Sequence, residues 1–219
     1  MRWIHGLVGI TFALHLAVVP HAALAQAPTH PNLNAQLLVA ARQGDVKAVE
    51  RALGQGAAPN SRNRLGKTAL LMAAEKGQAT LAEAMLKAGA DVNLASLEGV
   101  TPLMAASYGG HATLARRLLA AGAATAPQDR MRRSAMVYAA GQGHVDVVAA
   151  LLDAGVPLDA RYENQLTALM WAAGQGQAKV ADLLVARGAQ RDLRDDRALT
   201  AAEMARQNGH AALAATLVP

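Results

Sequence analysis

Three histidines recur along the chain at a regular interval that could align their side chains. The interval that separates His111 from His144 occurs twice more between His144 and His210. Neutral imidazole is a common metal ligand, so a row of these rings could bind a metal ion. In the other interpretation, each ring satisfies backbone groups of a neighbouring structural unit. We expect this structural role, with no metal and no cofactor.

Other residue types that could carry catalysis are absent or scattered. The chain has no cysteine, which excludes a thiol nucleophile and a cysteine metal site. It has no Gly-x-Ser-x-Gly motif, no glycine-rich phosphate loop and no His-Glu-x-x-His motif. The densest group of acids is interspersed with arginines, as in a solvated ion-pair ladder: Arg191, Asp192, Arg194, Asp195, Asp196 and Arg197. We therefore expect no enzyme, and a hydrolase assembled from several units is a remote alternative.

The charge of the chain raises the question of nucleic-acid binding. The formal net charge is +5, from 21 positive and 16 negative residues that are interspersed. A positive surface alone binds nucleic acid without specificity, and single-strand binding usually also needs aromatic stacking platforms. Only 3% of the residues are aromatic, whereas 53% are hydrophobic. We therefore expect a folded core and no nucleic-acid partner.

The N-terminal segment 1–25 contains the three parts of a secretory signal peptide. Arg2 is followed by an apolar run at 7–19 and then by the small-x-small site Ala23-Leu-Ala25. The run is shorter than the roughly 20 residues that a membrane helix needs. We expect residues 1–25 to be a signal peptide, residues 26–31 to be a linker, and the cleaved protein to lie in a bacterial periplasm without a membrane anchor. Secretion from the cell is the alternative.

The rest of the chain repeats itself at the same interval as the histidines. The segment 167–176 has counterparts one, two and three intervals earlier. Two series of glycines keep the interval: Gly44, Gly77, Gly110, Gly143, Gly176 and Gly209, and then Gly56, Gly89, Gly122, Gly155 and Gly188. Between them lie residues that are apolar on one helical face, as at 145–152. Each unit is therefore predicted to be a helix, a tight turn, a second helix and an extended stretch, stacked on its neighbours.

The segment 32–219 resembles the ankyrin repeat, a unit of about 33 residues. The resemblance rests on Thr101-Pro-Leu103, Gly143-His144, Val147-Val148, Leu151-Leu152 and the glycine-to-asparagine segment at 89–93. It implies an all-α solenoid of six stacked helix–turn–helix units with extended, β-hairpin-like fingers. The first and last units depart from the pattern, and we predict that they are caps.

Two departures from the ankyrin pattern lead to further predictions. The family's histidine after Thr-Pro-Leu is replaced by Leu71, Met104, Val137, Met170 and Glu203. We therefore expect apolar contacts in place of the family's threonine–histidine hydrogen bonds. The finger glycine is kept at Gly66 and Gly99 but is replaced by Arg132, Gln165 and Ala198. The last three fingers are therefore expected to differ in turn geometry.

The resemblance also implies a concave face, lined by the fingers and first helices, that binds another protein. The candidate partner-binding residues are Arg64, Lys67, Lys76, Tyr108, Arg130, Met131, Arg132, Arg133, Tyr138, Asn164, Trp171 and Arg197. The run Arg130-Met-Arg-Arg133 suits an acidic partner, although an ordinary solvated finger tip is the other interpretation. Tyr138 and Trp171 hold equivalent positions in adjacent units. Their rings are expected to approach each other, either in the core or on the floor of the groove.

Together these features predict a monomeric, non-catalytic interaction module or scaffold in the periplasm. Some exported bacterial proteins that look like this are associated with oxidant defence or with support of a neighbouring enzyme, so the resemblance implies such a role. The leading alternative is a secreted protein that acts on a host protein.

Overall fold

The structure is a computed structural model in which residues 31–218 are described. The predicted signal peptide at 1–25 lies outside these residues, as does the predicted linker apart from residue 31, which begins the first helix. Within 31–218, no helix is both long and apolar enough to cross a membrane.

The described residues form twelve α-helices in six pairs, with no strand among them. The first helices of the pairs are α1 (Pro31–Gln43), α3 (Ala69–Glu75), α5 (Pro102–Tyr108), α7 (Ala135–Gln142), α9 (Ala168–Gly174) and α11 (Ala201–Gln207). The second helices are α2 (Val46–Gly54), α4 (Ala79–Lys87), α6 (Ala112–Ala120), α8 (Val145–Asp153), α10 (Ala178–Ala186) and α12 (Ala211–Thr216). The predicted all-α solenoid is confirmed.

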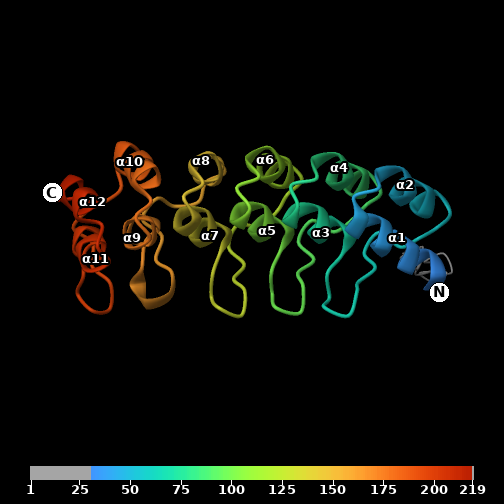
Figure 1. Cartoon of the computed structure of the whole chain (residues 1–219), viewed down its shortest axis with the longest axis horizontal. Helices are drawn as coiled ribbons and strands as arrows, with labels where there is room; N and C mark the ends of the chain where they lie inside the picture. Colours follow the sequence, from blue (N-terminus) through green and yellow to red (C-terminus); the bar gives the residue numbers. More distant parts are fainter. Residues whose placement is uncertain (1–30, 219) are drawn as a thin grey trace, which may run out of the picture.

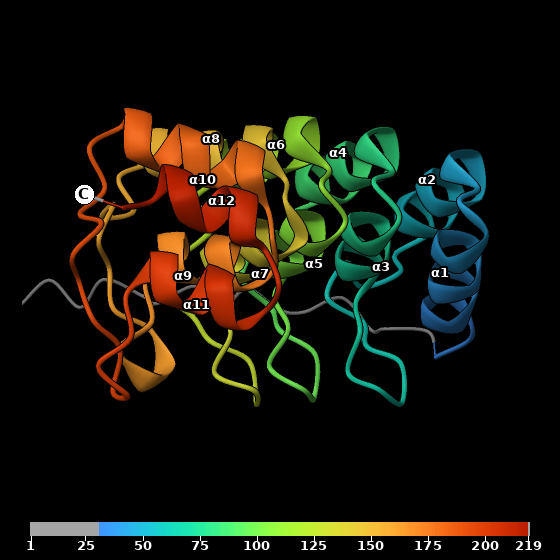
Figure 2. The ribbon, with the colours of Figure 1, turned by 60° about the vertical axis from the view of Figure 1, so that its left-hand side comes forward.

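The helices form two layers that run the length of the molecule. The first helices make one layer and the second helices the other, and five loops project from the first layer (Figure 1). We call these loops the first to fifth fingers; their turns lie at 63–67, 96–100, 129–133, 162–166 and 195–199. A short 3₁₀ helix, η1 (Glu163–Gln165), lies in the fourth finger. Figure 2 shows that all five fingers leave the same side of the stack.

A hydroxyl residue begins each first helix after α1. Thr68, Thr101, Ser134, Thr167 and Thr200 have an extended backbone, and each side chain accepts a hydrogen bond from the backbone N–H three residues later. This is N-capping, which satisfies a helical N–H that has no partner within the helix. The recurrence of threonine or serine at this position of each of these repeats therefore has a local structural cause.

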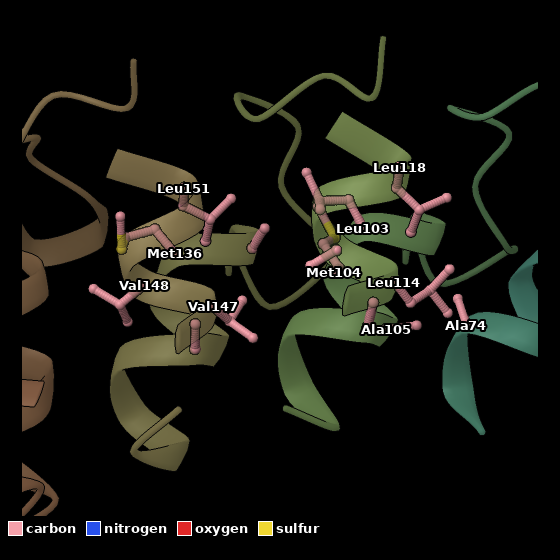
Figure 3. Close-up of a cluster of buried hydrophobic side chains, with 14 of the residues drawn as sticks. Ala74, Leu103, Met104, Ala105, Leu114, Leu118, Met136, Val147, Val148 and Leu151 are labelled. Carbon is pink, nitrogen blue, oxygen red and sulfur yellow. The ribbon is translucent and has the colours of Figure 1, made fainter. Parts of the chain in front are cut away.

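The core lies between the two layers and continues from one repeat to the next. Leu103 of α5 and Leu114 and Leu118 of α6 are at most 1% exposed, and Met136 of α7 packs near Leu151 of α8 in the neighbouring repeat (Figure 3). The first helices contribute many buried alanines, and such small side chains allow short helices to pack closely. The hydrophobic cluster is therefore continuous along the stack.

The first five glycines of the first series each lie under a side chain of the next repeat, whereas no such side chain of the described residues lies within 4 Å of the Cβ position of Gly209. The residues that begin the second helices of the next repeats are Gln78, His111, His144, Gln177 and His210, and none of these side chains caps its own helix. Each instead lies over the glycine of the preceding repeat, where a Cβ atom would be 2.3–2.6 Å from it. These glycines also have positive φ angles, which disfavour other residues.

This packing gives the histidines a structural role. The Nε2 atom of His144 lies 2.8 Å from the carbonyl oxygen of Tyr108 in the preceding repeat, and Gln177 donates to the equivalent carbonyl of Gly141 at 3.1 Å. His111 and His210 contact the glycines but have no such bond among the described residues. Residues 31–218 contain no group of three His, Cys, Asp or Glu side chains placed to hold a metal ion.

The prediction of a different turn in the last three fingers is wrong for two of them. Arg132 and Ala198 have φ angles of 55° and 61°, in the same left-handed region as Gly66 and Gly99. Asp129 and Asp195 stabilise these turns because each Oδ1 accepts two backbone N–H groups. In the fourth finger, Tyr162 replaces this acid.

The fourth finger differs in geometry, as predicted. Its Gln165 has a φ angle of 60°, and Asn164 before it is also left-handed at 55°. The two residues belong to η1, which the other fingers lack in the described chain. Burial raises the pKa of Tyr162, at the base of this finger, to about 12.

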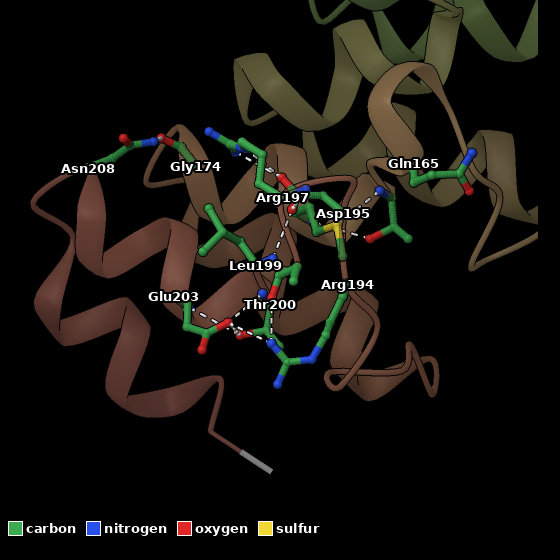
Figure 4. A network of polar contacts seen from close by, with 12 residues as sticks. Gln165, Gly174, Arg194, Asp195, Arg197, Leu199, Thr200, Glu203 and Asn208 are labelled. Atoms are coloured by element: carbon green, nitrogen blue, oxygen red, sulfur yellow. Dashed lines mark hydrogen bonds and ion pairs between the residues drawn. The ribbon is translucent and has the colours of Figure 1, made fainter.

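The prediction that apolar side chains replace the family's histidine contacts holds at four positions, although the sulfur of Met170 also accepts the backbone N–H of Thr167 at 3.4 Å, and it fails at the fifth. Leu71, Met104, Val137 and Met170 are at most 3% exposed. Glu203 instead accepts hydrogen bonds from the backbone N–H and hydroxyl of Thr200 at 2.7 and 2.9 Å and pairs with Arg194 at 3.4 Å (Figure 4). These hydrogen bonds lower the pKa of Glu203. The last repeat thus keeps a polar contact at this position.

Candidate binding face

Two adjoining pockets open between the fingers and the first helices in the middle of the stack. The hollow between fingers and first helices is the concave face, and four consecutive first helices, α3, α5, α7 and α9, contribute to the two pockets. The larger, of about 380 Å³, is the tyrosine pocket; its lining residues are Glu75, Val100, Met104, Ala105, Tyr108, Arg133 and Tyr138. The smaller, of about 220 Å³, is the tryptophan pocket; its lining residues are Arg133, Val137, Tyr138, Gly141, Gln142, Trp171 and Gln175.

An aromatic pair forms one wall of the tyrosine pocket. The rings of Tyr108 and Tyr138 meet edge to face, with centroids 5.5 Å apart and planes at 88°. The guanidinium of Arg133 lies 5.9 Å from the centre of the Tyr138 ring. Edge-to-face pairs and a cation over a ring face are both favourable geometries. These two contacts therefore hold the three side chains of the wall in a fixed arrangement.

The carboxylate of Asp129 holds the aromatic wall in place through hydrogen bonds. Its Oδ2 accepts the hydroxyl of Tyr138, and its Oδ1 accepts the backbone N–H groups of Met131 and Arg133 at 2.8 and 2.9 Å. Burial raises the pKa of Tyr138 to about 12, and the negative charge of Asp129 adds to the shift. Tyr138 therefore remains a protonated donor near neutral pH. Asp129 was not predicted as a site residue from the sequence, although Asn63 and Asp195 occupy the same position in other repeats.

Tyr138 and Trp171 line the same pocket, in line with the expected approach of their rings, but the two rings do not form a direct aromatic pair. Each ring packs instead over a residue near the end of the preceding first helix. For Tyr138 that residue is Tyr108; for Trp171 it is Gly141, where a Cβ would lie 3.9 Å from the indole. Tyr138 therefore has an aromatic partner, whereas Trp171 has none at the equivalent place because Gly141 has no side chain.

Both rings serve the core and the groove. Tyr138 and Trp171 are half-buried and pack against the hydrophobic cluster, yet both line the tryptophan pocket. The indole N–H of Trp171 is buried and has no hydrogen-bond partner among the described residues. Each ring therefore packs on the core and also lines a pocket.

Most of the predicted cations are partly neutralised by neighbours. Lys67 pairs with Glu75 at 2.6 Å, Arg130 with Glu98 at 3.2 Å, Arg132 with Glu163 at 3.9 Å and Arg197 with Asp195 at 2.9 Å. Lys76 donates to the carbonyl of Arg42. Among the described residues, Arg64, Lys76 and Arg133 make no ion pair within 4.0 Å. Of these three, Arg133 lines both pockets.

Exposed apolar side chains continue the surface onto the finger tips. Leu65, Leu97 and Met131 are 61%, 56% and 58% exposed, in the first, second and third fingers. Asn164 and Arg197, both exposed, hold the position of Met131 in the last two fingers. The apolar part of the tips therefore adjoins the tyrosine pocket and not the C-terminal repeats.

Backbone hydrogen bonds tie most fingers to their neighbours. Leu97 donates to Leu65 at 3.0 Å, Arg130 to Glu98 at 3.0 Å, and Asp196 to Asn164 at 3.1 Å. The equivalent bond between the third and fourth fingers is absent in the described chain, where the side chains of Arg132 and Glu163 face each other. The first three fingers thus form one connected edge beside the tyrosine pocket.

Comparison with known proteins agrees with this architecture. A family model described as ankyrin repeats in three copies matches the chain in four overlapping stretches, at 37–129, 81–162, 110–195 and 136–219. No curated protein matches the chain. The family model covers nearly all of the described helices, and the chain therefore belongs to the ankyrin repeat family.

Proposed function

We propose that this protein binds another protein across the middle of its concave face, without catalysis of its own. Ankyrin repeats are protein–protein interaction modules. The observation that carries the location is the clustering of Tyr108, Tyr138 and Trp171 with Arg133 around two adjoining pockets. Aromatic residues and arginine are the types enriched at interface anchors.

Fixed geometry favours binding by such a surface. Asp129 holds Tyr138 and the backbone of the third finger in place. A surface that is already ordered loses little conformational entropy when a partner docks. The partner is proposed to be acidic because Arg133 faces the pockets without a counter-ion in the described chain.

The proposed location is a bacterial periplasm, where the protein acts as a monomeric scaffold for an enzyme or for stress defence. The signal-peptide pattern of residues 1–25 supports export. The same pattern would serve a protein secreted to act on a host target. Recovery of the cross-linked partner from the periplasmic fraction or from the culture medium distinguishes the two.

Site-specific photocross-linking in producing cells tests the binding face. A photoreactive residue at Met131, on the third finger, is compared with one at Arg116, an exposed position on α6 in the opposite layer. We expect a discrete adduct with one protein from Met131 and none from Arg116. Adducts from Arg116 alone would show that the partner binds the second-helix layer and would contradict the proposal.

A further inference from the structure

We infer that the tyrosine pocket and Arg133 form a two-part subsite for an extended peptide segment of the partner, in which an apolar side chain stands next to a carboxylate. This inference rests on the proposed function and names the chemistry that its central site takes. The apolar side chain enters the tyrosine pocket, and the carboxylate binds the guanidinium at its rim.

The apolar part of the subsite is set by its lining. Val100, Met104 and Ala105 supply aliphatic surface, and Tyr108 and Tyr138 supply the aromatic wall. The volume of about 380 Å³ is at the lower end of the range for small-ligand pockets. Such a pocket suits one large side chain with its adjoining backbone better than a folded surface.

The polar part of the subsite is the guanidinium of Arg133. It lines both pockets, so a segment that crosses from one pocket to the other passes it. Its position over the Tyr138 ring fixes the planar group, whose N–H donors match a carboxylate in a bidentate arrangement.

The acids near Arg133 are already engaged. Glu75, across the tyrosine pocket, pairs with Lys67 at 2.6 Å. Asp129 accepts two backbone N–H groups on one oxygen and the Tyr138 hydroxyl on the other. Among the described residues, no carboxylate pairs with the guanidinium of Arg133 within 4.0 Å, so a carboxylate from outside is the complementary group.

Neighbouring charges favour a peptide over a polyanion. The flanking cations Arg130 and Arg132 are each opposed by a glutamate, Glu98 or Glu163. A nucleic-acid backbone would need a continuous row of cations, whereas one unpaired arginine beside an apolar pocket matches one carboxylate beside one apolar side chain.

The test uses short peptides as the probe and the methionine methyl groups of the full chain as the reporter. Met104 lines the tyrosine pocket, and Met85 of α4 is fully buried in the second-helix layer. With methyl-labelled methionine, we titrate the acetylated, amidated hexapeptide Gly-Gly-Leu-Glu-Gly-Gly. Controls carry Gln in place of Glu, or Ser in place of Leu, and sodium acetate tests a free carboxylate.

We expect the Leu-Glu peptide to shift the Met104 signal in a saturable way and to leave Met85 unchanged. The Gln and Ser controls should each bind about threefold to tenfold more weakly. Acetate should leave Met104 unchanged, and a shift with acetate equal to that with the peptide would contradict the two-part subsite.

Two variants separate this inference from a general effect on folding. The Arg133→Gln protein should bind the Glu and Gln peptides with equal affinity. The Arg116→Gln protein, which loses the same charge on α6, should still bind the Glu peptide more tightly than the Gln peptide. The inference is overturned if Met104 does not respond at about 10 mM peptide, or if Arg133→Gln keeps the preference. If the photoreactive residue at position 131 still forms adducts with the partner in either of these two cases, the proposed function stands although the inferred subsite does not.

Discussion

The hydroxyl of Tyr138 donates to the carboxylate of Asp129 and thereby joins a first helix to the finger that precedes it. The same carboxylate accepts the backbone N–H groups of Met131 and Arg133. One acid therefore positions the aromatic wall, the cation at the rim of the tyrosine pocket and the third finger. This connection makes the middle of the concave face a single ordered unit.

Removing this acid should destabilise the protein. Asp129→Ala leaves two backbone N–H groups and a half-buried hydroxyl without their acceptor, so we expect a loss of about 2–3 kcal/mol in the free energy of unfolding. Urea denaturation measures it. In a double-mutant cycle, Tyr138→Phe should cost about 0.5–1.5 kcal/mol alone and little in the Asp129→Ala background. Fully additive losses would show that the two groups do not interact.

Alkaline pH should destabilise the fold through two tyrosines. The pKa values of Tyr138 and Tyr162 are raised from 10.0 to about 12 in the folded state. Their stabilising effect is present in full below pH 10 and is lost as the pH rises toward about 12, because the unfolded chain releases these protons first. Urea midpoints measured across this range should fall less steeply in the Tyr138→Phe, Tyr162→Phe double variant. An equal fall of the urea midpoint with pH in the double variant and in the unchanged protein would contradict the raised pKa values of the two tyrosines.

Two glycines with similar backbones should respond differently to alanine. Gly110 and Gly122 have φ angles of 71° and 87°, but only at Gly110 would a Cβ meet a side chain, 2.5 Å from His144. Gly122→Ala should cost about 1–2 kcal/mol for the left-handed backbone alone. Gly110→Ala should cost about 1–3 kcal/mol more because the ring must move. Thermal denaturation of both variants measures the difference, and equal costs would show that the histidine packing is unimportant.

Reciprocal changes in two fingers test the strain at the left-handed residues. Ala198 has a φ angle of 61°, so Ala198→Gly should stabilise the protein by about 0.5–1 kcal/mol. Gly99→Ala should destabilise it, because the φ angle is 80° and the Cβ would lie 3.1 Å from Asp129. Urea denaturation measures both changes. Destabilisation by Ala198→Gly would contradict the assignment of strain to this turn.

The architecture could be predicted from the sequence because its causes are local. Threonine or serine at the N-caps and glycine under a histidine or glutamine recur from repeat to repeat, so each element is specified within one repeat and its neighbour. The turn at Arg132 could not be predicted from the loss of glycine alone, because Asp129 stabilises the left-handed backbone.

The details of the binding face depend on contacts between repeats that do not join equivalent positions. Tyr138 meets Tyr108, and Arg130 pairs with Glu98, across separations shorter than the interval from Tyr138 to Trp171. Equivalent positions such as Tyr138 and Trp171 therefore do not meet as a ring pair. For the same reason, the cations of the third finger differ in their pairing, and only Arg133 lacks an acidic partner among the described residues.

The most direct test of the central claim is the affinity of the cross-linked partner for two matched variants. Tyr108 is 55% exposed at the tyrosine pocket, and Arg116 is exposed on α6. If the concave face binds the partner, Tyr108→Ala should weaken binding by about tenfold to thirtyfold, while Arg116→Ala leaves the Kd unchanged. An unchanged Kd for a folded Tyr108→Ala protein, with a loss for Arg116→Ala, would contradict the account.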